Sequence, residues 1–158
     1  MAGRSASVEV VVATEATDEI VAAVARLLPQ LSSSATSVDK SALAEIIAAP
    51  STLILLARDP SKGGEIIGTL TLVVFRIPTA TRAWIEDVVV DSDARGRGVG
   101  ERLTQEAIPL ATERGARTIE LTSRPSREAA RRLYERLGFT VRDTGVYRYD
   151  IASRERDG

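Results

Sequence analysis

The stretch that decides the fold of this chain is Arg95-Gly96-Arg97-Gly98-Val99-Gly100. It follows the hydrophobic run Ile85 to Val90 and precedes a segment with apolar residues at helical spacing: Val99, Leu103, Ala107, Leu110 and Ala111. This order predicts a buried strand that passes through a glycine-rich turn into a helix. The first backbone N–H groups of such a helix are unpaired and lie at the positive end of its dipole. Glycines let an anion approach and the arginines add charge, so the turn is predicted to bind phosphate.

The turn does not fit two common phosphate-binding patterns. A P-loop ends in Gly-Lys-Ser/Thr, but no lysine follows Gly100. A dinucleotide-binding G-x-G-x-x-G that opened at Gly96 would need its third glycine at Glu101. What remains is the pattern Arg-x-x-Gly-x-Gly, formed by Arg95, Gly98 and Gly100. The alternative is a glycine turn that caps a helix and binds no ligand.

A second informative segment runs from Ser126 to Phe139. It predicts an amphipathic helix whose apolar face holds Ala130, Leu133 and Leu137. Gly138 is placed to end this helix in a left-handed conformation. Ser123 or Ser126, beside Pro125, is the expected start signal.

These two segments together resemble the GNAT superfamily of acetyl-CoA-dependent N-acyltransferases. The matching residues are Arg95, Gly98 and Gly100 of the loop and Ala130, Leu133-Tyr134 and Gly138-Phe139 of the helix. The resemblance implies an α/β fold with the element order βααββββαβαβ. We therefore expect a mixed central sheet of about six to seven strands, flanked by about four helices.

The remaining elements can be assigned along most of the chain. We expect strands at Val8–Thr14, Thr52–Ala57, Ile66–Phe75, Trp84–Val90, Thr118–Ser123 and Val146–Ile151. Two further helices are expected, one opening at Thr17 and one from Asp39 or Ser41 to Ala49, with a loop at Pro29–Val38 between them. Asp59–Gly64 is predicted to connect two strands of a hairpin, and Gly115 to end the helix that follows the glycine loop. We expect residues 1–158 to form one domain with flexible ends at 1–6 and 153–158.

Composition bounds the class of protein. The chain has 158 residues, 44% hydrophobic residues and a net charge of −1, which is typical of a globular domain. No apolar run is long enough for a membrane span, and no signal peptide is visible. Without cysteine there is no sign of an oxidising compartment, so we expect a cytoplasmic protein. We expect no nucleic-acid or membrane partner, and a homodimer is left open.

The absence of two residue types narrows the chemistry. The chain has no histidine and no cysteine, which excludes a Ser-His-Asp triad, a Cys-His pair and an ordinary zinc site. Its acidic residues near the glycine loop show no recognised metal-ligand spacing, so no metal is expected: Glu86, Asp87, Asp91 and Asp93. Transfer of an acyl group from CoA to an amine suits this set, because it needs positioning and proton transfer but no protein nucleophile.

The resemblance implies roles for residues on the strand before the loop. In the family this strand carries a bulge, and here the main-chain groups of Val88, Val89 and Val90 would bind the pantetheine arm and polarise the thioester carbonyl. Glu86 is the preferred general base, directly or through water. Asp87 is its competitor, because a bulge changes which neighbour faces the cleft. A carboxylate that only orients the substrate is the third reading.

The resemblance also assigns residues to the leaving group and the cofactor. Tyr134 would donate a proton to the CoA thiolate, although a purely structural tyrosine is the alternative. Ser123 would contact the pantetheine arm. The pyrophosphate would lie on the loop, which comprises Arg95, Gly96, Arg97, Gly98, Val99 and Gly100. Arg127 stands where the family often has asparagine, which puts a pantetheine contact there in doubt.

The expected function is an N-acetyltransferase that moves an acetyl group from acetyl-CoA to a primary amine by direct attack in a ternary complex. The acceptor regions of the family correspond to Pro29–Val38 and Arg76–Thr81, and neither shows a recognisable pattern. A small-molecule amine is preferred, and a protein amine stays open. The alternatives are a non-catalytic acyl-CoA-binding regulatory module and a nucleotide-binding module, which lacks every companion motif.

Overall fold

The computed structural model describes residues 7–154. The strands are β1 (Glu9–Val12), β2 (Thr52–Asp59), β3 (Glu65–Ile77), β4 (Ala80–Val90) and β5 (Thr118–Glu120). The helices are α1 (Asp18–Leu31), α2 (Lys40–Ala48), α3 (Val99–Glu113), α4 (Glu128–Arg136) and the single turn α5 (Ile151–Arg154). Short 3-10 turns lie at Pro60–Lys62 (η1) and Ser92–Ala94 (η2).

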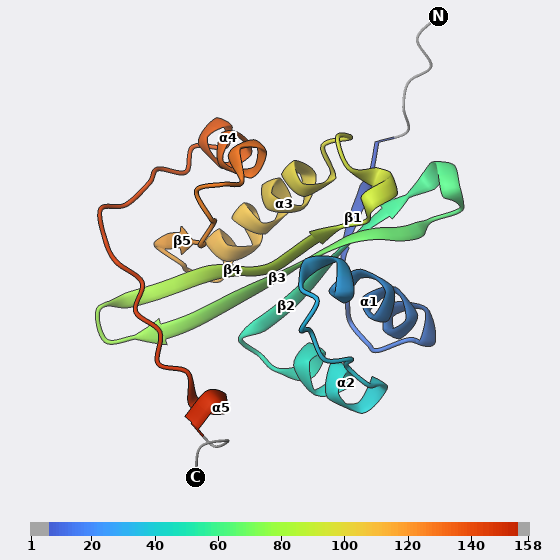
Figure 1. Ribbon diagram of the computed structural model, residues 1–158, viewed down its shortest axis with the longest axis horizontal. Helices are drawn as coiled ribbons and strands as arrows, with labels where there is room; N and C mark the ends of the chain where they lie inside the picture. The colour runs from blue at the N-terminus through green and yellow to red at the C-terminus, as the bar shows by residue number, and fades with distance from the viewer. Residues whose placement is uncertain (1–6, 155–158) are drawn as a thin grey trace, which may run out of the picture.

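The strands form one sheet in the order β1-β2-β3-β4-β5. The first four are antiparallel to their neighbours, and β5 runs parallel to β4. Helices α1 and α2 lie on one side of this sheet and α3 on the other, with α4 beside α3 (Figure 1). The expected mixed α/β fold is confirmed.

The sheet is buried on both faces by two separate clusters. Against α3 pack inward-facing residues of β2, β3 and β4, among them Leu55, Leu70 and Ile85. Against α1 and α2 pack the alternate residues, among them Ile54 and Leu56. Because both faces of β2 are covered, its sequence reads as a continuous apolar run instead of an alternating one.

Local signals predicted four of the helix ends. Thr17 caps α1 through a hydrogen bond from the Ile20 N–H, and Asp39 caps α2. Gly115 and Gly138 follow α3 and α4 with φ of +83° and +95°, as expected of glycines that end helices.

Helix α1 extends two residues beyond the predicted start of its loop. Pro29 lies inside the helix, and Leu31 ends it. A proline near a helix end removes only one intrahelical hydrogen bond, because its ring nitrogen carries no proton. Gln30 therefore belongs to the helix and not to the loop.

The expected strand at Val146–Ile151 is wrong. Residues 140–150 form no strand, and α5 begins at Ile151. Strand β5 is also shorter than predicted, since it ends at Glu120 and not at Ser123. A three-residue β5 offers a neighbouring strand few hydrogen bonds, and Val146 stays 74% exposed. Within residues 7–154 the sheet therefore has five strands where six to seven were expected, with three and not four between α2 and α3.

Gly68 on β3 sets how closely α3 approaches the sheet. A Cβ atom at this position would lie 3.1 Å from Val99 Cγ1 and 3.2 Å from the Val89 carbonyl oxygen. The missing side chain thus lets the first turn of α3 pack directly on the sheet, beside the end of β4.

The predicted flexible ends lie mostly outside the described residues, which exclude 1–6 and 155–158. Residues 153–154 belong to α5. Within residues 7–154, no helix combines the length and the apolar character that a membrane crossing requires.

Candidate active site

Strand β4 carries the predicted bulge close to its end. Glu86 and Val89 pair with residues that are only two positions apart on β3, so Asp87 and Val88 together lie opposite Leu70. Asp87 takes a φ of +47° and is the one non-glycine residue in the described part of the chain with a positive φ. The extra residue bends the strand and interrupts its ladder.

The bulge also reverses the alternation of the strand. Before it, Ile85 belongs to the cluster under α3. After it, Val88 and Val90 pack against that same cluster, while Val89 belongs to the cluster under α1 and α2. Counted by alternation, the side chain of Glu86 lies on the α1 and α2 side of the sheet, as Val89 does.

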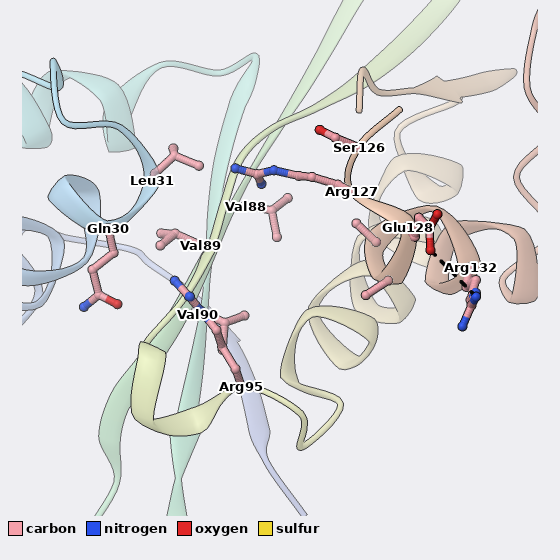
Figure 2. A pocket seen from close by; sticks show the side chains of 12 residues that line it. Gln30, Leu31, Val88, Val89, Val90, Arg95, Ser126, Arg127, Glu128 and Arg132 are labelled. Atoms are coloured by element: carbon pink, nitrogen blue, oxygen red, sulfur yellow. Dashed lines mark ion pairs between the residues drawn. The ribbon is translucent and has the colours of Figure 1, made fainter. Parts of the chain in front are cut away.

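A cleft opens where β4 and β5 diverge. The two strands pair only from Arg82 to Trp84, and no other described strand pairs with this edge of β4 beyond that point. The cleft has a volume of about 820 Å³ and lies between the end of β4, the end of α1 and the start of α4 (Figure 2). Val88, Val89 and Val90 line it from the sheet. Main-chain groups on this edge are thus available to a ligand.

The glycine loop joins the cleft to the start of α3. Gly96 and Gly98 have φ of +77° and +76°, a conformation that other residues rarely adopt. Gly98 is the N-cap of α3, and no side chain caps the first N–H groups of the helix. A Cβ atom at either glycine would meet nothing within 4 Å, so the space above the loop is open. This is the arrangement that binds an anion at a helix N-terminus.

Two arginines face the cleft from opposite sides. Arg95 lines it from the loop, and Arg127 reaches across it from the start of α4 toward Leu31 (Figure 2). Arg132 also lines the cleft and forms an ion pair with Glu128, in which Nη2 lies 3.9 Å from Oε2. These charges suit a phosphorylated ligand.

The serine start signals expected for α4 are wrong. Arg127 is the N-cap of this helix, and no side chain caps it. Ser126 lines the cleft, whereas Ser123 lies exposed in the segment after β5 and does not. Backbone hydrogen bonds form the start of this helix instead of a serine cap. The Arg127 N–H donates to the Arg124 carbonyl oxygen, and the Arg131 N–H donates to the Arg127 carbonyl oxygen.

Arg97 points away from the cleft to a buried carboxylate. Its Nη1 lies 2.9 Å from Oδ2 of Asp59, whose side chain is 0% exposed. The other oxygen, Oδ1, accepts hydrogen bonds from the backbone N–H and the hydroxyl of Ser61, at 2.9 and 2.6 Å. Hydrogen bonds from Ser61 and then from Arg97 lower the pKa of Asp59 from 3.8 to about 2.

Tyr134 lies on α4 with its ring against Phe139. The ring centroids are 5.7 Å apart in an edge-to-face arrangement. Burial raises the pKa of the Tyr134 phenol, and the positive charge of Arg127 opposes that shift. No hydrogen bond joins this hydroxyl to any residue from 7 to 154, and the ring does not line the cleft.

Glu86 and Asp87 are both exposed and form no ion pair with a described residue. Neither lines the 820 Å³ cleft, although Val88 beside them does. Across residues 7–154, no group of three or more acidic side chains is arranged to hold a metal ion. Both carboxylates are thus open to solvent.

The structure brings some of the predicted residues together and separates others. The cleft is lined by four of them: Val88, Val89, Val90 and Arg95. The rest of the loop borders the start of α3, outside the lining: Gly96, Arg97, Gly98, Val99 and Gly100. Glu86, Tyr134 and Ser123 are not among the lining residues. The roles proposed for these three depend on a ligand that bridges them to the cleft.

Residues of α1 were missed by sequence reasoning. Gln30 lines the cleft and accepts a hydrogen bond from the Ser92 N–H, at 2.9 Å. One turn earlier, Arg26 donates to the Ile66 carbonyl oxygen and lies 3.5 Å from Asp91. The end of α1 is therefore tied to the exit of β4. No spacing in the sequence signals these contacts, because they join residues 40 to 65 positions apart.

Comparison with known proteins gives consistent results. Residues 11–139 match the family model described as the acetyltransferase (GNAT) family. N-alpha-acetyltransferase 30 of Schizosaccharomyces pombe is 38% identical over 71 residues, which are 45% of this chain and 47% of that protein. Mycothiol acetyltransferase of Beutenbergia cavernae is 35% identical over 89 residues, 56% of this chain and 29% of that protein. The matched segments span less than half of both relatives.

A solved structure shows the same fold over nearly the whole chain. It is described as a transcriptional regulator from Bacillus halodurans C-125 and is 31% identical. It superposes with a TM-score of 0.74 and covers 91% of this chain and 100% of its own. The overall fold of this chain is thus shared with that protein.

Proposed function

Because the chain belongs to the acetyltransferase (GNAT) family, we propose that it transfers an acetyl group from acetyl-CoA to a primary amine in a ternary complex. The observation that carries this proposal is the open edge of β4 beside the uncapped start of α3. The first can bind an extended pantetheine arm through main-chain groups, and the second can bind a pyrophosphate.

The cofactor side of the site follows from these groups. The pyrophosphate lies on the N–H groups at the start of α3, with Arg95 and Arg127 adding charge from either side of the cleft. The pantetheine arm runs along Val88 to Val90. A main-chain N–H of this segment then donates to the thioester carbonyl oxygen, which gains negative charge as the bond forms.

The reaction needs two proton transfers. The amine nitrogen attacks the acetyl carbon, the C–S bond breaks, and the amine gives up one proton. Glu86 accepts that proton, directly or through water, because it is exposed and unpaired beside the bulge. Asp87 is the competing base. An alkyl amine has a pKa near 10.4, so only about one molecule in a thousand is free base near neutral pH and a base accelerates the reaction.

Tyr134 stabilises the departing thiolate. Its raised pKa keeps the phenol protonated, and its hydroxyl has no hydrogen-bond partner within residues 7–154. A thiol has a pKa near 8.5, below that of the phenol, so full proton transfer is uphill and the hydroxyl acts chiefly by donating a hydrogen bond that stabilises the thiolate as the C–S bond breaks. Ser123, exposed after β5, is the second candidate for contact with the pantetheine arm or the thiolate.

We favour a small-molecule amine as the acceptor, and a protein or peptide amine is the second candidate. The cleft volume of about 820 Å³ lies within the range of small-molecule sites. The similarity to mycothiol acetyltransferase supports the first candidate, and the similarity to N-alpha-acetyltransferase 30 supports the second.

Calorimetry with acetyl-CoA and an assay of thiol release test the proposal. The acceptor panel should contain small primary amines and peptides with free N-termini. Binding of acetyl-CoA with release of CoA in the presence of one amine class supports the proposal and identifies the acceptor. Binding without acetylation of any amine would instead indicate a non-catalytic acyl-CoA-binding module, and absence of binding would contradict the cofactor assignment.

A matched pair of glycine variants locates the binding site. Gly98 and Gly115 have similar positive φ values and equally open surroundings, but only Gly98 borders the loop. Valine at either position should strain the backbone by about 1–2 kcal/mol. Only Gly98→Val should also weaken acetyl-CoA binding. Equal affinity in both folded variants would argue against a pyrophosphate at this helix start.

Location and assembly stay predictions. We propose a cytoplasmic enzyme without a nucleic-acid or membrane partner, based on composition alone. Cell fractionation tests the first part, and sedimentation of the purified protein distinguishes a monomer from a homodimer.

A further inference from the structure

We propose that Asp59 is a positioning residue for the phosphate loop: through Arg97 it holds residues 95–98 in the conformation that presents the helix N–H groups to the cofactor. The inference rests on the proposed function in one respect, because it assigns a role in acetyl-CoA binding. It differs from the sequence-based expectation, in which Arg97 is itself a phosphate ligand.

Asp59 is a fixed acceptor. Its carboxylate is fully buried at the end of β2, and Ser61 holds one of its oxygens with two hydrogen bonds. The turn around it is closed by a hydrogen bond from the Gly64 N–H to the Asp59 carbonyl oxygen, at 2.9 Å. The second carboxylate oxygen therefore occupies a defined place, at which it binds Arg97.

Arg97 is the residue through which this fixed point acts on the loop. It lies between Gly96 and Gly98, both of which have positive φ. Glycines lose more backbone entropy than other residues when they become ordered, so a loop built on them needs an outside restraint. Of residues 95–100, all of which the structure describes, Arg97 alone forms an ion pair. The turn between β2 and β3 and the loop before α3 lie at the same end of the sheet (Figure 1).

The geometry argues against a direct phosphate contact by Arg97. Its guanidinium is bound to the Asp59 carboxylate, whereas Arg95 lines the cleft and forms no ion pair with a described residue. To reach a phosphate, Arg97 would have to leave Asp59 behind as a buried charge with only Ser61 as its partner. Removing one partner of a buried pair is strongly unfavourable. Arg95 thus faces the ligand cleft, whereas Arg97, two residues later, holds the loop to Asp59.

The test compares Asp59→Asn, Arg97→Gln and the double variant with the wild type. Asp18→Asn is the matched control, since it removes the same charge from an exposed pair between Asp18 and Lys40. Two ligands are titrated: acetyl-CoA, and S-acetylpantetheine, which lacks the pyrophosphate. Both single variants should bind acetyl-CoA about tenfold more weakly, and the double variant should be no weaker than either, as expected of residues that act as one unit. Binding of S-acetylpantetheine should not change.

A direct phosphate contact by Arg97 gives a different pattern. Asp59→Asn would then release the guanidinium and leave acetyl-CoA affinity equal or higher. Arg97→Gln would also make acetyl-CoA binding less dependent on salt, because the protein would lose a cation that contacts the phosphate. Either result overturns the proposal, as does a similar loss in Asp18→Asn.

Amide hydrogen exchange of the ligand-free protein provides an independent readout. Residues 95–100 should exchange faster in Asp59→Asn and in Arg97→Gln than in the wild type, and Arg97→Lys should restore part of the protection. If Asp59→Asn fails to fold, the comparison of Arg97→Gln with Arg97→Lys decides: unchanged protection in a folded Arg97→Gln variant contradicts the tether. If the wild type does not bind acetyl-CoA, the proposed function fails while hydrogen exchange still tests the tether.

Discussion

At the scale of single residues, the bulge gives two adjacent acidic residues different backbone conformations. Glu86 continues the regular strand, whereas Asp87 is the inserted residue and has a positive φ. Asparagine accepts such a φ nearly as well as aspartate. An Asn substitution at this position therefore removes the charge without adding strain, which makes the two carboxylates separable by experiment.

Glu86→Gln should depress kcat/KM near neutral pH and recover partly at high pH, where the amine loses its proton unaided. Asp87→Asn, the matched control, should not reproduce this profile. The measurement is a pH–rate series with any accepted amine on the wild type and both variants. A Glu86→Gln profile equal to that of the wild type would remove Glu86 from the mechanism.

Tyr134→Phe should lower turnover by about ten- to a thousandfold, the scale of a lost proton donor, and leave acetyl-CoA affinity unchanged. The edge-to-face contact with Phe139 does not need the hydroxyl, so the fold should persist. Burial raises the pKa of this phenol, so the donor stays protonated up to pH 10. Deprotonation of Tyr134 should therefore cause no loss of wild-type rate at any pH below 10. Tyr147→Phe, at a side chain that is 97% exposed, is the control. Full activity in Tyr134→Phe would leave the tyrosine a structural role.

At the scale of elements, the sequence predicted what local signals control. The cap at Thr17, the glycine loop and one of the two caps considered for α2, Asp39, lie where residue type and short-range spacing placed them, and the bulge lies where the family resemblance implied it. The last strand was predicted wrongly because a strand depends on a partner, and β5 is too short to provide one. The tie between Arg97 and Asp59 was equally invisible, since the two residues are 38 positions apart and neither has a distinctive spacing.

Gly68→Ala should destabilise the protein by about 1–3 kcal/mol, the usual cost of overpacking. The new Cβ would press on the Val89 carbonyl oxygen and on Val99, which hold the end of β4 and the start of α3. Gly100→Ala is the comparison, because its Cβ would make ordinary contacts at 3.8 Å and alanine favours a helix. Urea denaturation of both variants measures the difference. Equal stabilities would show that α3 can move away from the sheet at little cost.

At the scale of the whole molecule, Asp59 couples stability to acid. Its pKa is about 2 in the folded protein and near 3.8 when unfolded, so the unfolded state binds more protons as pH falls between these values. Its contribution to stability is fully present above pH 3.8 and is lost as pH falls through 2. Denaturation midpoints measured from pH 5 to pH 2 should fall more steeply in the wild type than in Asp59→Asn. Parallel curves would show that this carboxyl does not titrate with unfolding.

The bulge at Asp87 has a consequence for how the chain tolerates insertions and deletions. Counted in steps of two from Ala83, Val89 would share a face with Ile85, and the extra residue moves it to the opposite face. Deleting Asp87 would make the strand regular and leave the three valines on their present faces, so it would remove the bulge alone. Exchanging a valine for isoleucine would leave every main-chain group in place. The bulge thus depends on the number of residues in β4 more than on their identity.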